Sequence, residues 1–95
     1  MSDTLSRQNP FPIALEGSLD FHTVPYLRKN LLKALRAISA PAVELDFSRV
    51  TKVDTSGIAM LVELNRIAVS KGGEVSLRGM NDQARRMMRL ARLDQ

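Results

Sequence analysis

The residues best placed to do chemistry stand together in the middle of the chain. Asp54, Thr55 and Ser56 precede Gly57, and an apolar run follows. The segment 42–47 ahead of them alternates like a strand, so this polar group falls between a strand and a helix start. A helix start exposes unpaired N–H groups and the positive end of the helix dipole. The position therefore suits a side-chain cap, and it also suits a switchable phosphate on a hydroxyl.

Two interpretations of these side chains stay open. A hydroxyl or carboxylate here would cap the helix, which stabilises it by about 1 kcal/mol. Alternatively, Thr55 is exposed as a contact or modification site, and Asp54 hydrogen-bonds a partner or a kinase. A phosphate would add about −1.5 to −2 charges, which the helix dipole tolerates but a partner surface packed there would not. The domain would then stay folded while its binding is switched off.

The helix that follows is apolar all round in its first turns, from Ile58 to Val62. A surface helix would normally show a polar stripe there. Either these turns are buried on both sides, or Met60 and a neighbour are exposed as a protein-docking patch. Periodicity does not assign the solvent side, so both interpretations stand.

The rest of the chain does not indicate catalysis. The one histidine, His22, lies beside Asp20, a pair more typical of a solvated loop than of a general base. The sequence has no cysteine, no phosphate-binding or dinucleotide-binding glycine motif, and no metal-spaced cluster of histidines or carboxylates. We therefore expect a protein that is not an enzyme and that binds neither a metal nor a cofactor.

The net charge of +4 is concentrated near the C-terminus, since residues 78–95 hold five arginines and two acids. This stretch reads as a basic amphipathic helix. A solvated charged face is the simplest interpretation, and contact with a membrane surface or an acidic partner is the alternative. Nucleic-acid binding is not favoured, because no recognised motif is present and only three Phe and one Tyr could stack on bases.

The pattern of apolar residues predicts a single α/β domain over residues 1–95. Predicted strands at 11–15, 42–47 and 74–77 alternate with predicted helices at 24–38, 57–70 and 82–93. Thr23 and Pro25 mark the first helix start, Gly72-Gly73 the second helix end, and Asn81 or Asp82 the last cap. This order predicts a mixed, largely parallel sheet of about four strands flanked by helices. Residues 1–10 are expected to be flexible or to add an edge strand at 4–8.

The N-terminus lacks the pattern of a signal peptide, and the longest unbroken apolar run, from Ile58 to Val62, is far too short to cross a membrane. We therefore expect a soluble, cytoplasmic protein.

Three segments together resemble the STAS family, the domain shared by sulfate transporters and anti-sigma-factor antagonists. They are GSLDFHT at 17–23, LDFSRVTKVDTSGIAMLVEL at 45–64 and KGGEVSLRGMNDQARRMMRL at 71–90. The resemblance implies a mixed sheet flanked by helices and a non-catalytic regulatory or docking role. In anti-sigma-factor antagonists the hydroxyl residue directly after the Asp is phosphorylated, which here is Thr55, where the family more often has Ser. The unphosphorylated antagonist binds an anti-sigma kinase and thereby releases the sigma factor.

A second branch of the family is similar too: the small STAS subunits of the ABC transporter that maintains outer-membrane lipid asymmetry. The stretch VSLRGMNDQARRMMRLARL is similar to their closing strand and helix, and several carry Thr at the position of Thr55. This branch implies docking on the ATPase subunit, and contact with the membrane only through the transporter complex. The expected partner is therefore this ATPase, with an anti-sigma kinase as the alternative. Thr55 is the expected switch, and the expected partner-binding residues are Asp54, Thr55, Ser56, Gly57, Ile58 and Met60.

Overall fold

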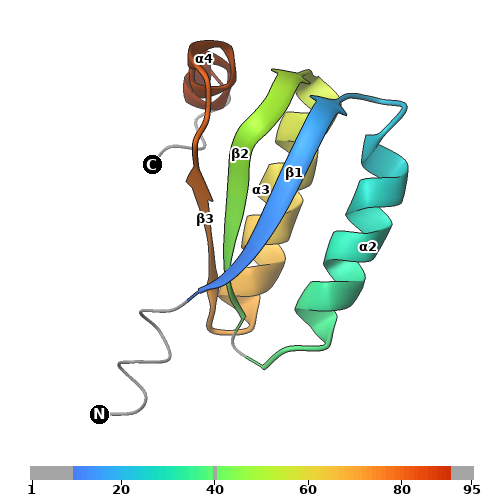
Figure 1. Cartoon of the computed structure of the whole chain (residues 1–95). Helices are drawn as coiled ribbons and strands as arrows, with labels where there is room; N and C mark the ends of the chain where they lie inside the picture. The colour runs from blue at the N-terminus through green and yellow to red at the C-terminus, as the bar shows by residue number, and fades with distance from the viewer. Residues whose placement is uncertain (1–9, 40, 91–95) are drawn as a thin grey trace.

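The computed structural model describes residues 10–39 and 41–90 of the chain. In this part, strands and helices alternate as the sequence predicts (Figure 1). The elements are β1 (Phe11–Leu19), α2 (Val24–Arg36), β2 (Ala42–Val53), α3 (Thr55–Ser70), β3 (Glu74–Arg78) and α4 (Asp82–Leu90). None of the described helices is long and apolar enough to span a membrane.

The three described strands form one parallel sheet in the order β1-β2-β3. Leu45 of the central strand is paired with Ile13 of β1 on one side and with Leu77 of β3 on the other. The α/β class is therefore confirmed. The expected fourth strand at 4–8 lies outside the described residues, and the strands that are described show no antiparallel pair.

Strand β1 continues past Leu15, where the sequence placed its end, and this prediction was wrong. The polar segment 16–18 stays paired with β2 through two irregularities in register, between Ala14 and Glu16 and between Gly17 and Ser18. Such bulges let a strand follow its partner through residues that would otherwise form a turn. As a result β1 reaches Leu19 and ends level with Val53, the last residue of β2.

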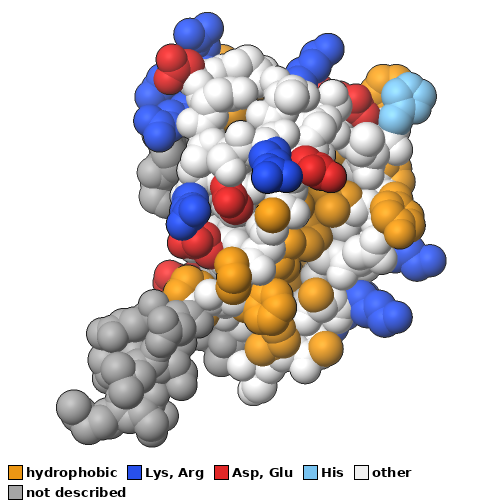
Figure 2. All heavy atoms as spheres, viewed as in Figure 1, with side chains coloured by type: hydrophobic (Ala, Val, Ile, Leu, Met, Phe, Trp, Pro, Cys, Tyr) orange, Lys and Arg blue, Asp and Glu red, His pale blue; other side chains and the backbone are white. Residues whose placement is uncertain are grey.

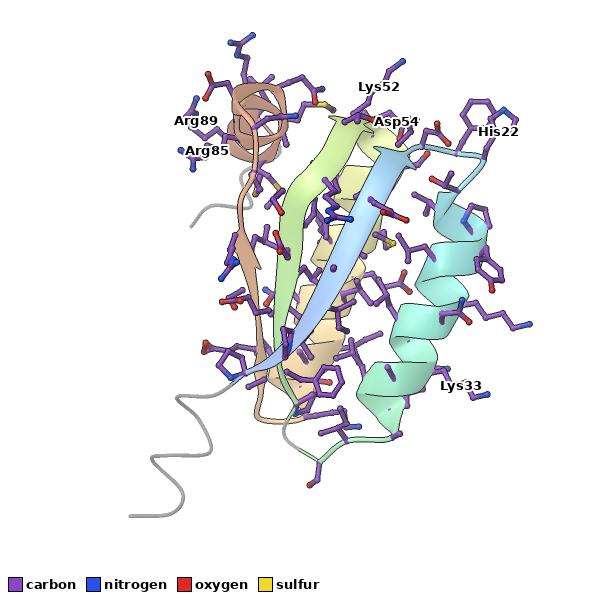
Figure 3. All side chains as sticks on the ribbon, in the orientation of Figure 1. His22, Lys33, Lys52, Asp54, Arg85 and Arg89 are labelled. Carbon is purple, nitrogen blue, oxygen red and sulfur yellow. The ribbon has the colours of Figure 1, made fainter. Side chains whose placement is uncertain are left out.

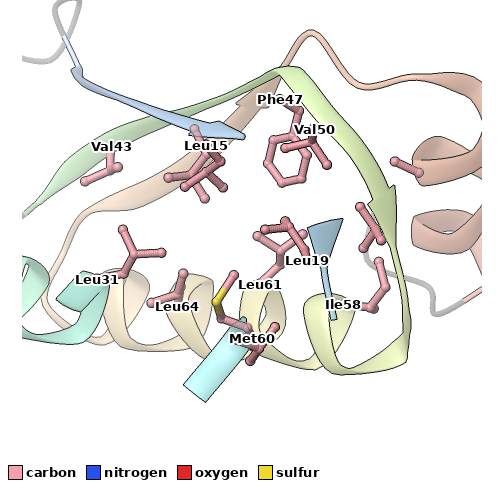
Figure 4. Packing of buried hydrophobic residues seen from close by; sticks show 14 of the residues in the cluster. Leu15, Leu19, Leu31, Val43, Phe47, Val50, Ile58, Met60, Leu61 and Leu64 are labelled. Atoms are coloured by element: carbon pink, nitrogen blue, oxygen red, sulfur yellow. The ribbon is translucent and has the colours of Figure 1, made fainter. Parts of the chain in front are cut away.

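Helices α2 and α3 lie side by side on one face of the sheet, and α4 packs beside the upper part of β2 (Figure 1). Alternate residues of β2, among them Val43, Leu45 and Phe47, point toward the helices and are at most 4% exposed. Figure 4 shows Val43 and Phe47 on the strand side of this core, facing the helices that carry Leu31, Leu61 and Leu64. Burying each large aliphatic side chain in such a core stabilises the fold by roughly 1.5–3 kcal/mol. This core fixes where the strand ends lie.

An apolar groove runs between the lower part of β1 and the second half of α2, where hydrophobic side chains gather in Figure 2. Phe11, Leu31 and Ile38 are among the residues that line it. This groove lies where the strands begin, at the opposite end of the sheet from their carboxyl ends.

The three helix boundaries marked in the sequence lie where they were predicted, and two of them show the expected closing hydrogen bonds. Gly72 takes a positive φ of 80°, and the N–H of Gly73 donates to Ala68 O at 2.8 Å, which closes α3 as the glycine pair predicts. Asn81 caps α4 by accepting from Ala84 N at 2.8 Å. Thr23, in contrast, does not cap α2 with its side chain.

The hydroxyl of Thr23 instead donates to Ser18 O at 2.6 Å. In this turn the carboxylate of Asp20 accepts hydrogen bonds from the N–H groups of His22 and Thr23, at 2.9 and 3.1 Å. These hydrogen bonds lower the pKa of Asp20 below its ordinary value. The loop after β1 is thus folded tightly on itself by Asp20.

Lys71 closes the carboxyl end of α2 from outside. Its Nζ donates to Leu35 O at 2.7 Å and to Arg36 O at 3.1 Å. A cation at this place satisfies carbonyls that the helix leaves unpaired and opposes the negative end of the dipole.

We predict that Lys71→Met lowers the free energy of unfolding by about 1 kcal/mol, because charged hydrogen bonds to two backbone carbonyls are lost. Urea unfolding followed by circular dichroism measures this. The matched control is Lys29→Met, an exposed position on α2. Equal effects of the two substitutions would contradict the capping role.

Helices α2 and α3 are also joined by an ion pair. Arg28 binds Glu63 with two parallel hydrogen bonds of 2.5 and 2.6 Å. The hydrogen bond from Arg28 is the main reason why the pKa of Glu63 lies below its ordinary value of 4.5. Because Glu63 binds protons less readily when folded, its contribution to stability is present above that value and is lost as pH falls through the folded pKa.

We predict that Glu63→Gln is less stable than the parent at pH 7 and that the difference shrinks as the pH falls below the ordinary pKa of 4.5. Other carboxylates titrate in both proteins and cancel in the comparison. Urea unfolding at a series of pH values provides the measurement. A difference that does not change with pH would exclude this contribution of the pair.

Candidate docking site at the start of helix α3

The parallel strands all end at the same edge of the sheet, so the loops that follow them gather there. Figure 3 shows His22, Lys52 and Asp54 together at this end, whereas Lys33 lies toward the other end. The polar group singled out in the sequence therefore lies at the carboxyl edge of the sheet. This is the place where open α/β folds commonly hold their binding sites.

Asp54 is the residue that organises this edge. Its backbone is extended, with φ −106° and ψ −173°, and its Oδ1 accepts from Ser56 N at 2.8 Å and from Gly57 N at 3.2 Å. Its own N–H donates to Leu19 O at 3.0 Å. One residue therefore caps α3 and ties the end of β2 to the end of β1. Of the two sequence interpretations of Asp54, the structure contains the cap.

Because Asp54 provides the cap, the two hydroxyls beside it are released from that role. Thr55 is exposed in the first turn of α3, and its hydroxyl makes no hydrogen bond to the described residues. Ser56 is half-buried. A hydroxyl at this position can donate and accept a hydrogen bond with an outside molecule, next to the positive end of the helix.

Gly57 is buried where α3 passes closest to the sheet. A Cβ at this position would lie 2.9 Å from Leu19 O and 2.9 Å from Val53 Cγ1, closer than real Cβ atoms come. Only glycine lets the first turn of α3 seat against the ends of β1 and β2. Its role at the site is thus structural: it sets the position of Thr55.

Ile58 and Met60 are 6% and 1% exposed. The expectation that Met60 is exposed as a docking patch was therefore wrong, and the alternative of a buried helix start is correct. The physical reason is that α3 touches the sheet, α2 and α4, so its first turns need apolar side chains in several directions.

The outward side of α3 is formed instead by Thr55, Ala59 and Arg66, which are exposed and spaced to share one face. The sequence analysis did not select Ala59 or Arg66. Their spacing of four and eleven residues from Thr55 was a usable signal, once the buried side of the helix was known.

Two exposed aromatic residues flank the same edge on the α2 side. Phe21 is 67% exposed and Tyr26 is 74% exposed, and the Phe21 ring stacks on His22 with 4.1 Å between centroids. Large aromatic side chains left in water are typical of protein-contact surfaces. In the sequence these two residues were considered only as possible base-stacking groups, not as part of a protein contact.

These features define a small parallel α/β domain. Its helix α3 is capped by Asp54, and an exposed hydroxyl follows the cap, which is the arrangement of a STAS domain. A family model described as "Mlab, STAS domain" matches residues 4–95. The chain belongs to this STAS family. The family resemblance and the fold expected from it are thereby confirmed.

The chain is 35% identical over 94 residues to the intermembrane phospholipid transport system binding protein MlaB of Escherichia coli strain K12, covering 98% of this chain and 93% of that protein. It is 24% identical to the anti-sigma F factor antagonist of Paenibacillus polymyxa, over 85% of this chain and 69% of that protein. The phosphorylated form of the Bacillus cell fate determinant SpoIIAA shares the fold. Its TM-score is 0.71 and its identity 24%, over 87% of this chain and 75% of that structure.

We predict that Gly57→Val lowers the free energy of unfolding by about 1–3 kcal/mol, because its side chain overpacks the contact with Leu19 and Val53. Thermal and urea unfolding measure the loss. Ala59→Val adds a valine to the exposed side of the same helix and is the matched control. If both substitutions cost the same, the close approach at Gly57 is not needed.

Proposed function

We propose that the chain is a non-catalytic docking subunit of a bacterial phospholipid-transport ABC system, and that it binds the ATPase subunit through the exposed start of α3. The observation that carries the proposal is that Thr55 is exposed and makes no side-chain hydrogen bond to the described residues, while Asp54 and Gly57 hold the helix start in place. The similarity to MlaB over nearly the whole chain supports the transport system.

The division of roles around Thr55 supports its use as a contact. The first turns of α3 are supported from inside the domain. Asp54 caps them, and Gly57 lets them contact the sheet closely. The side chains of Ile58 and Met60 are buried beneath them. Thr55, with half-buried Ser56 beside it, presents polar groups to the partner. A partner hydrogen-bonded to Thr55 would therefore meet a surface whose shape is fixed before binding, which lowers the entropic cost of association.

This function places the chain at the inner face of the inner membrane, where it is held by the transporter complex. Its contact with the membrane is indirect in this proposal.

A second function is favoured by a specific observation: the chain is also similar to an anti-sigma F factor antagonist, and its hydroxyl follows the capping Asp. In that case a kinase partner would phosphorylate Thr55. The phosphate would lie at the positive end of α3, so the fold would tolerate it while the added charge repels the partner.

We predict that Thr55→Glu changes the free energy of unfolding by less than about 1 kcal/mol, because a carboxylate is tolerated at a helix start. Binding to the ATPase subunit of the host's own transporter should weaken by at least about tenfold, which corresponds to 1.4 kcal/mol. Titration calorimetry measures the affinity, and thermal unfolding checks the fold.

Ser39→Glu is the matched control, since it makes the same change at an exposed position at the opposite end of the sheet. Tagged wild-type protein is also recovered from a lysate of its host, beside the Thr55→Glu variant. An ATPase and permease lost only in the variant support the transport function. Recovery of an anti-sigma kinase instead, with no ATPase binding, would replace it by the sigma-switch function.

A further inference from the structure

Helix α4 carries three exposed arginines on one side. Arg85, Arg86 and Arg89 lie opposite Ala84 and Met88, which are buried against the rest of the domain. We call these three residues the arginine stripe. The described part of the chain contains ion pairs of Arg28 and Arg78, and none of them involves the stripe.

The arginines of the stripe repel one another. Arg85 and Arg89 are four residues apart on a helix, where like charges repel. The only acid on the described helix is Asp82 in its first turn, and the ion pairs of the described residues include none between Asp82 and the stripe. The guanidinium groups of the stripe make no ion pair with the described residues, so they are available to an acidic group from outside.

The stripe is held in place at the carboxyl edge of the sheet, where Thr55 lies; we call this edge the docking end. Gln83 Nε2 donates to Val53 O at 3.0 Å, directly before Asp54, and Asn81 caps the helix. Figure 3 shows Arg85 and Arg89 projecting from α4 away from the sheet, and Figure 2 shows basic side chains gathered at that corner. Thr55 and the stripe therefore start from the same edge and keep a fixed relation to each other.

The chemistry of α4 favours a protein over a lipid surface. A helix that binds in the membrane interface needs a free apolar side, but here Ala84 and Met88 are 1% and 7% exposed. Guanidinium groups pair with carboxylates through two parallel hydrogen bonds, which suits an acidic protein surface.

We propose that the arginine stripe is a second contact with the same ATPase subunit and binds a cluster of Asp or Glu side chains on it. The inference rests on the proposed function, because it takes the ATPase as the partner at Thr55. Thr55 then provides a short-range contact that depends on geometry. The stripe provides electrostatic attraction that speeds association and weakens with salt.

The test compares Arg85→Gln/Arg86→Gln/Arg89→Gln with Lys29→Gln/Lys33→Gln/Arg36→Gln. The second variant removes the same charge from exposed positions on α2. Binding of the purified ATPase subunit is followed by surface plasmon resonance between about 50 and 300 mM salt, a range that spans strong to weak screening. Circular dichroism and thermal unfolding verify that each variant is folded.

We expect the stripe variant to bind about tenfold or more weakly at low salt, mainly through slower association, while the α2 variant stays within about twofold of wild type. The wild-type association rate should fall steeply with salt, and the stripe variant should show a shallower dependence. Wild-type association that is independent of salt overturns the inference even if a variant fails to fold.

Three further results would overturn the inference. Equal binding by the stripe variant and the α2 variant, with wild type still bound, rejects the stripe and leaves the proposed function intact; no binding by wild type rejects both. Vesicles of phosphatidylcholine with phosphatidylglycerol provide the lipid arm. If wild type but not the stripe variant floats with them, and ATPase binding is unchanged, the stripe is a lipid contact instead.

Discussion

The arrangement of the docking end depends on the hydrogen bonds of one residue, Asp54. Its N–H joins the end of β2 to Leu19 at the end of β1, and its carboxylate caps α3 through Ser56 and Gly57. Leaving the N–H groups of a buried helix start without an acceptor would lower the stability of the fold. The cap is therefore needed because α3 begins in close contact with the sheet. Because Asp54 meets that need, the hydroxyl of Thr55 is left for another use. The cap and the exposed hydroxyl are thus two results of one local geometry.

Structure and function are separated at this end residue by residue. Gly57 and Met60 are packed in the core, where an added atom or a lost contact would lower the stability of the fold. Thr55 precedes Gly57 by two residues and is exposed, so a charge can be added to its side chain without disturbing the core. The same edge holds α4, which Gln83 fixes to Val53. A partner that approaches the edge therefore meets a polar helix start and a basic helix in a constant relative position.

The sequence predicted what depends on local pattern, and it missed what depends on neighbours. Period-two and helical spacing identified all the described strands and helices, and Gly72-Gly73 and Asn81 acted as predicted. The ends of β1 and β2 were misplaced, at Leu15 and Phe47 instead of Leu19 and Val53, because pairing between the two strands keeps residues 16–19 and 48–53 extended. The exposure of Met60 was misjudged because a helix that is apolar all round does not reveal how many elements surround it. The hydroxyl at Thr55 was found, yet its freedom became clear only once Asp54 was seen to be the cap.

The central claim is that the chain meets its partner through the edge where Thr55 lies. Hydrogen–deuterium exchange of the chain, alone and saturated with the ATPase subunit, tests this most directly. We expect exchange to slow over residues 54–60 and 82–90 when the ATPase is bound, while the lower parts of β1 and α2 exchange as before. Slowing confined to the groove around Phe11, Leu31 and Ile38, with residues 54–60 unchanged, would contradict it and place the interface at the opposite end of the sheet.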